Sequence, residues 1–394
     1  MGGNINSKNI QQKLKKVFES KFGYQTSHYS VSPASLVLLG DHTHYNDGIN
    51  ISTTVDRYSA AAVSVREDDL IRIHSEDERF NAYLSLNEIS EKKLECGSVD
   101  LNSVIELLKE KQFINTGFDC AVQTNIPDAL GLGRFASLQF TLLSAINSAY
   151  GLNFNLENII ELGHKAGLKA IGKISNKTHY HTISGNKANS FFKIDFRKNT
   201  TEIFDLNSTD YCIVICETDE LIENPTEICN ERISECEVGA QALRLYIWGI
   251  KSLRDVELAF LEKHAHVLPK RVYKRALYNV LERMRSDKAS AALDKHDFSE
   301  FGKLLFESHA SLRSEYEIGN ENLDFLVDYA TKFNGVLGSK LISCSHIHST
   351  LNIVEKSESE KFTRKIKHKF KQKYDRLLKT HVLNICDGIK AQSQ

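Results

Sequence analysis

The sequence predicts an α+β protein built from two lobes. Its 394 residues suit about two domains at roughly 150–200 residues each. Apolar residues make up 41% and charged residues 26% of the chain, which is typical of a globular protein with a real core. Short β-rich runs and longer amphipathic helical patterns occur in both halves. We therefore expect an N-terminal lobe over residues 1–205 and a C-terminal lobe over residues 206–394.

The first half combines strands with helices. It opens with a helical pattern that places Leu14, Val17, Phe18 and Phe22 on one face. The elements expected here are the helices Gln11–Phe22, Ser103–Lys111, Ala136–Tyr150 and Leu156–Leu168, and the strands Ser35–Leu39, Ser59–Val65, Leu70–His74 and Ser190–Phe196.

The second half is mainly helical. A buried strand is expected at Tyr211–Cys216 and a strand pair at Ser339–Cys344 and Thr350–Val354. The helices expected are Ile233–Trp248, Arg254–Glu262, Val272–Lys288, Phe298–Arg313, Leu323–Phe333 and Lys361–Lys379. The last of these is rich in lysine, but its apolar residues recur about every four positions, so the lysines are read as a solvated face.

Composition and charge exclude several classes of protein. The net charge is −1, so no global charge attracts the chain to nucleic acid or to an anionic membrane. No apolar run approaches the ~18 residues that span a bilayer, and the start lacks the apolar centre of a signal peptide. The eight cysteines are too sparse for a disulfide framework. We expect a cytoplasmic protein with reduced thiols and no nucleic-acid or membrane partner, whose oligomeric state is left open.

Several ordered motifs resemble those of galactokinases, which are members of the GHMP family of small-molecule kinases. The segment SPASLVLLGDHTHYNDG resembles their first, sugar-binding motif, and NIPDALGLGRFASL resembles their phosphate loop. NERISECE, a helix pair and GVLGSKLISCSHIHS match later motifs. These segments are Ser32–Gly48, Asn125–Leu138, Asn230–Glu237, Glu307–Val327 and Gly335–Ser349. Because the matches run nearly end to end, the resemblance implies the two-lobed galactokinase-like fold.

The resemblance also shows that the family's catalytic positions are replaced. The arginine of the first motif is Ser35, its sugar-contacting aspartate is His44, and a sugar-contacting tyrosine falls at Cys229. The small hydroxyl residues of the phosphate loop become Arg134 and Phe135. The catalytic aspartate is expected where residues 179–181 read His-Tyr-His. From these replacements we expect that ATP phosphotransfer is lost and that ATP with Mg²⁺ is not used.

Three His-x-His pairs stand at these replaced motifs. An extended segment projects residues i and i+2 to the same side, so each pair can offer two imidazoles to one metal ion. Imidazole suits several transition metals. The sequence therefore predicts a metal site for Zn, Fe, Cu or Mn, with the ligands His42, His44, His179, His181, His346 and His348. A fourth pair, at His264 and His266, lies in a helical pattern and is read as unrelated.

Further site residues follow from their positions beside these motifs. Asp41 is assigned as a catalytic and substrate-binding carboxylate, and Tyr180 as a catalytic acid or base. Tyr45 and Arg134 are assigned to substrate binding. For both tyrosines, simple packing is the alternative.

The leading interpretation is a non-kinase metalloenzyme that acts on a small polar molecule in the former sugar pocket. Two alternatives are left open. One is a non-catalytic sensor of a sugar or another ligand on a decayed kinase fold, and the other is a divergent ATP-dependent sugar 1-kinase.

Overall fold

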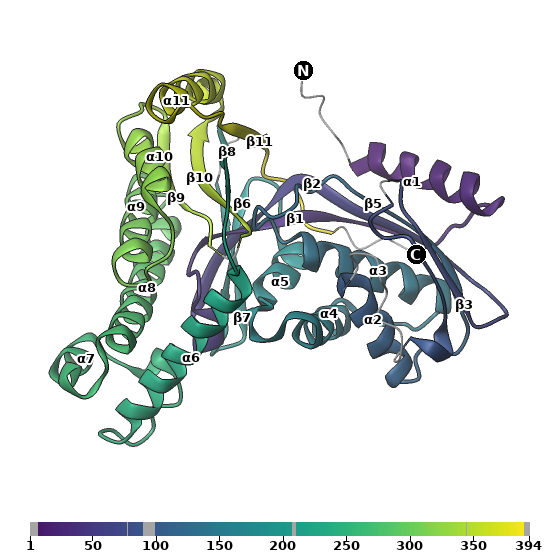
Figure 1. Cartoon of the computed structure of the whole chain (residues 1–394), viewed down its shortest axis with the longest axis horizontal. Coiled ribbons are helices and arrows are strands. Elements are labelled where there is room, and N and C mark those ends of the chain that lie inside the picture. The colour runs from purple at the N-terminus through teal and green to yellow at the C-terminus, as the bar shows by residue number, and fades with distance from the viewer. Residues whose placement is uncertain (1–6, 77, 90–98, 207–209, 344, 390–394) are drawn as a thin grey trace.

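The computed structural model describes residues 7–76, 78–89, 99–206, 210–343 and 345–389 (Figure 1). Cys344, the expected end of a strand, lies outside them. The elements of the first half are α1 (Ser7–Phe22), β1 (Tyr29–Leu39), β2 (Ile49–Val65), β3 (Leu70–His74), β4 (Ala82–Ser85), α2 (Val99–Glu110), β5 (Phe118–Thr124), α3 (Arg134–Tyr150), α4 (Leu156–Ile171), α5 (Lys177–Gly185), β6 (Ser190–Asp195) and β7 (Thr200–Asp205).

The strands of the first half form one seven-stranded sheet in the order β4-β3-β5-β2-β6-β7, with β1 also paired to β2. All pairs are antiparallel except β3 with β5. Strand β2 is long enough to pair with β6 through its first residues and with β5 through its last. It therefore forms the centre of the sheet.

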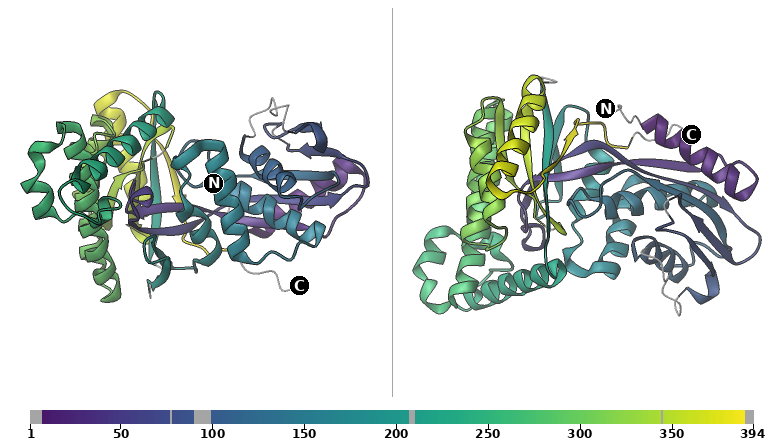
Figure 2. Two further views of the ribbon diagram at one scale, coloured as in Figure 1. Left: turned by 90° about the horizontal axis from the view of Figure 1, so that it is seen from below. Right: turned by 45° about the horizontal axis from the view of Figure 1, so that its top comes forward.

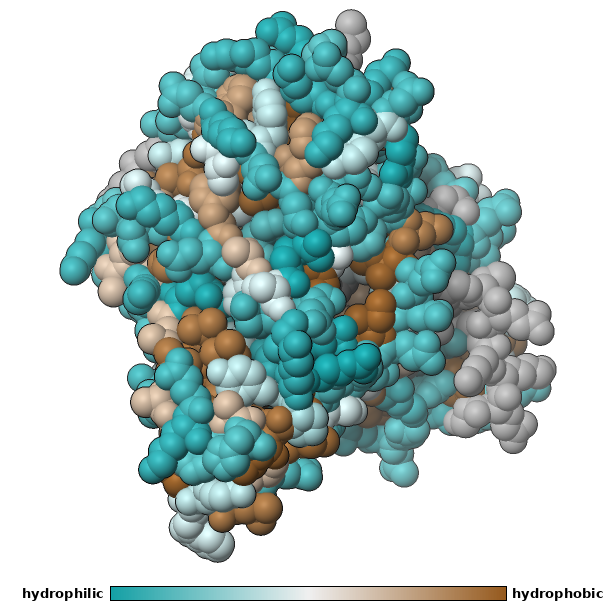
Figure 3. Space-filling view, turned by 60° about the vertical axis from the view of Figure 1, so that its left-hand side comes forward, coloured by the Kyte–Doolittle hydropathy of each residue, from teal (hydrophilic) through white to brown (hydrophobic). Residues whose placement is uncertain are grey.

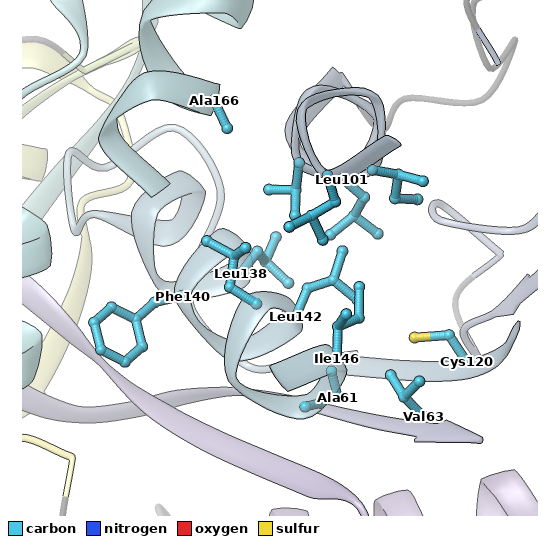
Figure 4. Packing of buried hydrophobic residues seen from close by; sticks show 14 of the residues in the cluster. Ala61, Val63, Leu101, Cys120, Leu138, Phe140, Leu142, Ile146 and Ala166 are labelled. Carbon is cyan, nitrogen blue, oxygen red and sulfur yellow. The ribbon is translucent and has the colours of Figure 1, made fainter. Parts of the chain in front are cut away.

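Different helices cover the two faces of this sheet. Along β2, successive side chains point to opposite faces, so neighbouring residues contact different helices. Ala60 and Ala62 pack in the cluster that holds the apolar face of α1. Ala61 and Val63 point the other way, into the cluster that contains α2, α3 and α4 (Figure 4). Because successive side chains of a strand point to opposite faces, one stretch of small apolar residues serves both layers.

The second half contains a smaller sheet covered by long helices. Its elements are β8 (Tyr211–Leu221), α6 (Pro225–Arg244), α7 (Leu258–Lys263), α8 (Lys270–Asp294), α9 (Phe298–Ser314), α10 (Glu321–Thr331), β9 (Val336–Leu341), β10 (Ile347–Glu355), α11 (Ser359–Tyr374) and β11 (Lys379–Leu383). The sheet has the order β11-β8-β10-β9 and is antiparallel throughout. The views in Figure 2 place these helices at the end of the molecule opposite α1.

A shared core joins the two sheets. Ile213 and Ile215 of β8 lie in one apolar cluster with Leu36 and Leu38 of β1. Residue 55 of β2 forms an isolated bridge with residue 385, beyond β11. The two halves therefore pack as one structure, while the division at residues 205 and 206 stays a prediction.

The α+β class is confirmed, but several expected elements differ. Residues 177–185, read as an extended His-x-His segment, form helix α5. Strands β4, β5, β7 and β11 were not predicted. Helix α6 ends at Arg244 rather than at Trp248. Leu245 and Trp248, which follow the end of α6, are 84% and 98% exposed. Hydrophobic side chains also gather at the lower end of the molecule in the view of Figure 3. Among the described residues, no helix combines the length and apolar character needed to cross a membrane.

Candidate active site

A cavity of about 320 Å³ is lined by residues from both lobes. Its walls are the end of β1, the loop that follows β1, the turn before α3, the start of α5, and the loop between β9 and β10. Residues that line it include Asp41, His42, His44, Gly133, Arg134, His179, Ser343 and His346. Three of the motifs singled out in the sequence therefore meet at one cavity.

The loop of residues 40–48, which follows β1, is held in place by helix α8. The backbone N–H of Gly40 donates a hydrogen bond of 2.9 Å to Glu282. The hydroxyl of Tyr278 donates one of 2.9 Å to the carbonyl oxygen of Asp41, and Asn46 donates to Asn279 at 3.0 Å. These buried hydrogen bonds fix a loop of the first lobe against a helix of the second, so the side chains of the loop are held in a defined orientation.

Asp41 forms a buried ion pair with Lys340 of β9 and accepts a hydrogen bond from the hydroxyl of Ser343. The side chain of Lys340 is fully buried. Burial alone would raise the pKa of the Asp41 carboxyl, but Lys340 and Ser343 outweigh it and hold the pKa below its usual value. Asp41 is therefore an ionised carboxylate whose charge is compensated within the protein.

The turn before α3 supplies a helix N-terminus to the cavity. Gly133, the N-cap of α3, has a φ of +62° and no side chain caps the helix. The first N–H groups of a helix have no intrahelical partner, and with the helix dipole they favour anions. The guanidinium of Arg134 lies at this end of the helix, 2.6 Å from the carboxylate of Asp128. Arg134 thus stands where a bound anion would meet α3.

His179 of α5 contacts the same turn. Its Nδ1 is 2.9 Å from the hydroxyl of Ser35, whose backbone N–H donates to the carbonyl of Leu132 at 3.1 Å. A Cβ at Gly133 would lie 2.5 Å from the Ser35 hydroxyl and 2.7 Å from His179 Nδ1. Burial lowers the pKa of His179 to about 4, so the imidazole is neutral at pH 7.

Two further histidines that line the cavity, His42 and His44, are also neutral. Burial lowers the pKa of His42 to about 4 and that of His44 to about 3. His42 Nδ1 lies 3.2 Å from the hydroxyl of Tyr45, and His44 Nε2 lies 3.4 Å from the carbonyl oxygen of Lys173. His44 Nδ1 is buried without a hydrogen-bond partner.

The predicted metal site is wrong. In the part of the chain that the structure describes, no group of three or more His, Cys, Asp and Glu residues is placed to hold a metal ion. His179 and His181 lie on a helix, where residues two apart do not share a face. The pair at residues 42 and 44 is not extended either, because His42 has a φ of +57° and a short 3₁₀ helix begins at His44.

The third pair is divided between two cavities. His346 lines the cavity described above, whereas His348 lines a neighbouring one. His181 lines neither of them, and its Nε2 is buried without a partner. His42, His44, His179 and His346 therefore share a cavity without forming a metal cluster.

The two tyrosines lie in packed surroundings. The side chain of Tyr180 is buried in the core with α3 and α4, and its hydroxyl donates to Gln139. The hydroxyl of Tyr45 is hydrogen-bonded to that of Tyr316. Tyr180 also lines the cavity, and the Tyr45 hydroxyl contacts His42. The catalytic and substrate-binding assignments of these residues stay predictions.

Comparison with known proteins identifies the family. A model described as the galactokinase galactose-binding signature matches residues 16–65, and one described as the GHMP kinase N-terminal domain matches residues 101–179. The chain is a galactokinase-like member of the GHMP kinase family. It is 28% identical to a galactokinase of Clostridium acetobutylicum over 97% of this chain and 98% of that protein. It is 27% identical to a galactokinase of Roseiflexus sp. over 95% and 96%.

Solved structures agree with this assignment to the GHMP kinase family. The structure of Lactococcus lactis galactokinase complexed with galactose superposes with a TM-score of 0.88 and 25% identity, over 96% of this chain and 99% of that one. The mevalonate kinase of Methanococcus jannaschii superposes with a TM-score of 0.63 and 18% identity, which supports the fold alone. The predicted galactokinase-like fold is confirmed.

These findings overturn the interpretation as a non-kinase metalloenzyme. Galactokinases match almost the whole chain, and the histidines do not gather into a metal site. The expectations of lost phosphotransfer, of a transition metal and of no use of ATP with Mg²⁺ are therefore wrong. The reasoning failed because it took each replaced residue of the GHMP kinase motifs as a loss of function, although three of these motifs still meet at one cavity.

Sequence reasoning missed two residues of the site. Lys340 and Ser343 hold the carboxylate of Asp41, yet neither was singled out. A signal was present for Lys340, because it lies in an apolar strand pattern between Ser339 and Leu341. A lysine is almost never fully buried unless it is paired. A lysine in a strand expected to be buried therefore predicts a charged partner.

Proposed function

We propose that the protein is an ATP-dependent sugar kinase that phosphorylates a galactose-like hexose at its anomeric hydroxyl. The observation that carries the proposal is the cavity itself, in which the loop of the galactose-binding signature meets the N-terminus of α3. Support comes from the galactokinases that match nearly the full chain. The sugar would contact the loop of residues 40–48, and the phosphates would lie at α3.

The residues around α3 fit the phosphates of a nucleotide. The uncapped N–H groups at the start of α3 and the guanidinium of Arg134 are donors for phosphate oxygens. Asp41 and Asp128, the two carboxylates that line the cavity, are both paired with cations. Mg²⁺, which usually keeps several waters, would accordingly be held mainly by phosphates and water and would neutralise their charge.

His179 is the group we assign to accept the proton of the attacking hydroxyl. In the tautomer whose Nδ1–H donates to Ser35, the lone pair of Nε2 accepts that proton. Its pKa of about 4 is close to the ordinary value of ~3.9 for an aspartate, the residue that the family resemblance places here. The low pKa makes His179 a weak base. Phosphoryl transfer depends mostly on positioning and electrostatic stabilisation, so a weak base suffices.

A sugar-binding protein without phosphotransfer is the second candidate. It is favoured by Phe135, whose bulky side chain lines the cavity in the first turn of α3, where the resemblance places a small hydroxyl residue. Both candidates require the cavity to bind a sugar, so they differ only in turnover. The expectations of a cytoplasmic location and of no nucleic-acid or membrane partner stay predictions.

The test is ADP formation by the purified chain with Mg²⁺-ATP and each of a panel of hexoses, with the sugar 1-phosphate identified by NMR. Galactose or a close epimer should be turned over, and His179→Ala should reduce kcat at least 100-fold. His264→Ala is the control, because His264 lies outside the cavity and bonds the backbone of Phe260. Sugar-dependent thermal stabilisation without ADP formation would instead favour the sugar-binding candidate.

A further inference from the structure

The segment that follows helix α6 exposes a run of large apolar side chains. Leu245 and Trp248 are almost fully exposed, and Tyr246 and Ile247 between them are about half exposed. Val238, which lies two turns before Leu245, is about half exposed as well. These five residues form the α6-end face. The end of α6 lies at the lower edge of the molecule in Figure 1.

This segment is anchored at both ends, so its exposure does not come from a loose loop. The backbone N–H of Tyr246 donates to the carbonyl oxygen of Leu243 at 3.0 Å. The guanidinium of Arg244 donates to the carbonyl oxygens of Ile250 and Lys251 at 2.6 and 3.1 Å. Leu243 and Ile250, on either side of the exposed run, are both buried in the core of the second half. The α6-end face therefore has a fixed shape that a partner can match.

The α6-end face is large for the surface of a monomer. Other exposed apolar side chains of the described residues, such as Tyr83 and Leu377, stand singly in the sequence, which is normal for a protein surface. At roughly 150–250 Å² for each aromatic side chain, the five residues together expose about 600 Å². A stable interface buries roughly 800 Å² on each partner, including a polar rim. The face is therefore large enough to form the apolar centre of such an interface.

The chemistry of the α6-end face fits a second copy of this chain. In a twofold dimer the same patch meets itself, so any charge within it would oppose a like charge. Residues 245–249 carry no charge, and the neighbouring Arg244 directs its guanidinium to carbonyl oxygens of its own chain. Tryptophan and tyrosine are also the side chains that most often dominate binding energy at interfaces. The face can therefore pair with itself without electrostatic cost.

A partner on the α6-end face leaves the candidate active site open. Thr226, in the first turn of α6, lines the first cavity, and none of the five residues of the face does. The 20 residues of α6 separate the two ends of the helix by about 30 Å. The cavity and the face therefore lie at opposite ends of one helix.

We infer that two copies of the chain associate about a twofold axis through the α6-end face, so that Trp248 of each copy is covered by the other. The removal of these apolar side chains from water drives the association. The inference is independent of the proposed kinase function, because it concerns a surface outside the cavity.

The test follows association and the burial of Trp248 in the same samples. Sedimentation velocity of the purified full chain is measured from about 1 to 100 μM, because interfaces of this size have micromolar or lower dissociation constants. Trp248 is the single tryptophan of the chain, so tryptophan fluorescence reports on this face alone. As the dimer forms, the emission should shift to shorter wavelength and its quenching by iodide should decrease.

Two variants test whether the α6-end face forms the dimer. Leu245→Glu and Trp248→Glu each bring like charges together across the twofold axis, and each should raise the dissociation constant of the dimer at least ten-fold. Leu377→Glu is the matched control, because Leu377 is 73% exposed but follows α11 and lies outside the face. It should associate as the parent does. The melting temperatures establish that all three variants fold, since exposed side chains contribute little to stability.

Each other outcome would overturn the inference. A chain that stays monomeric up to about 100 μM has no self-associating face of this strength. A dimer in which iodide still quenches Trp248 fully, or an unchanged dimer of folded Leu245→Glu, would show association through another surface. A monomer whose tryptophan emission shifts when phosphatidylcholine vesicles are added would show that the face binds lipid instead.

Discussion

Asp41 and Lys340 form a buried ion pair that connects the loop after β1 to strand β9. The two residues are far apart in sequence. Asp41 follows β1 of the seven-stranded sheet, whereas Lys340 lies in β9 of the four-stranded sheet. Because Ser343 bonds the second carboxylate oxygen, the carboxylate of Asp41 is held from the C-terminal half. The cavity therefore keeps its shape only when both halves of the chain are packed together.

Removing the lysine should destabilise the whole fold. Lys340→Met leaves the buried Asp41 carboxylate without its cation, and breaking a buried ion pair in this way costs about 3–5 kcal/mol. The double variant Asp41→Asn with Lys340→Met removes both charges and should recover a large part of this loss. Urea unfolding of the two variants and the parent measures it. Equal stability of the single variant and the parent would contradict the prediction.

Stability should fall as the pH decreases from about 6.5 to 4. Burial lowers the pKa of His42 and His179 to about 4 and that of His44 to about 3, whereas an unfolded histidine has a pKa near ~6.5. Within this window the unfolded chain binds protons that the folded chain does not, so unfolding becomes more favourable as pH falls. At about 1.4 kcal/mol per pKa unit, each histidine contributes up to about 3 kcal/mol.

Unfolding free energies at pH 7, 5.5 and 4.5 test this dependence. His179→Asn removes one titrating group without adding charge, so its stability should decline less steeply than that of the parent. A parent stability that is constant over this range would show that these histidines are already exposed to solvent or protonated in the folded chain.

The sequence predicted the fold well because the GHMP kinase motifs occur in order along the whole chain. It also placed Asp41, His42, His44 and His179 near one site, and the structure does bring them to one cavity. These residues sit on loops and helix ends whose positions the family fold determines. The order of the motifs therefore accounts for the correct predictions, which are the fold and the grouping of these four residues.

The metal site could not be judged from spacing alone. A His-x-His pair presents both rings to one side only in an extended chain, and neither pair at residues 42–44 and 179–181 is extended. Helix α5 begins at Lys177, after Asn176, whose side chain accepts from the N–H of Thr178. Asparagine is a preferred N-cap residue, so this start signal was present in the sequence and was overlooked. The partner of Asp41 was missed because Lys340 lies about 300 residues away and pairs only in the folded chain.

Two glycines that cap α3 allow a matched test of the turn beside the cavity. Gly133 and Gly151 both have a φ of +62°. A Cβ at Gly133 would meet Ser35 Oγ at 2.5 Å, whereas nothing lies within 4 Å of one at Gly151. Gly151→Ala should cost about 1 kcal/mol from the left-handed backbone alone. Gly133→Ala should cost at least about 1 kcal/mol more, because Ser35 and His179 must move.

The measurement is the urea midpoint of the two variants, together with the thermal shift that each shows with Mg²⁺-ATP. Gly133→Ala should also weaken the nucleotide response, since the strained turn leads directly into the first N–H groups of α3. Equal destabilisation of both variants would mean that the turn at Gly133 relaxes without cost.

Two arginines that bind the same carboxylate distinguish nucleotide binding from simple ion pairing. Arg134 and Arg79 each lie 2.6 Å from Asp128, but only Arg134 lines the cavity. A charge-assisted hydrogen bond to a charged group contributes about 1.5–3 kcal/mol, so Arg134→Ala should raise the KM for ATP about ten-fold or more. Arg79→Ala removes a similar partly exposed ion pair and should leave that KM within about two-fold of the parent, because surface pairs contribute about 0–1 kcal/mol. Initial rates of ADP formation over a range of ATP concentrations measure both, and an equal effect of the two variants would show that Arg134 acts only through Asp128.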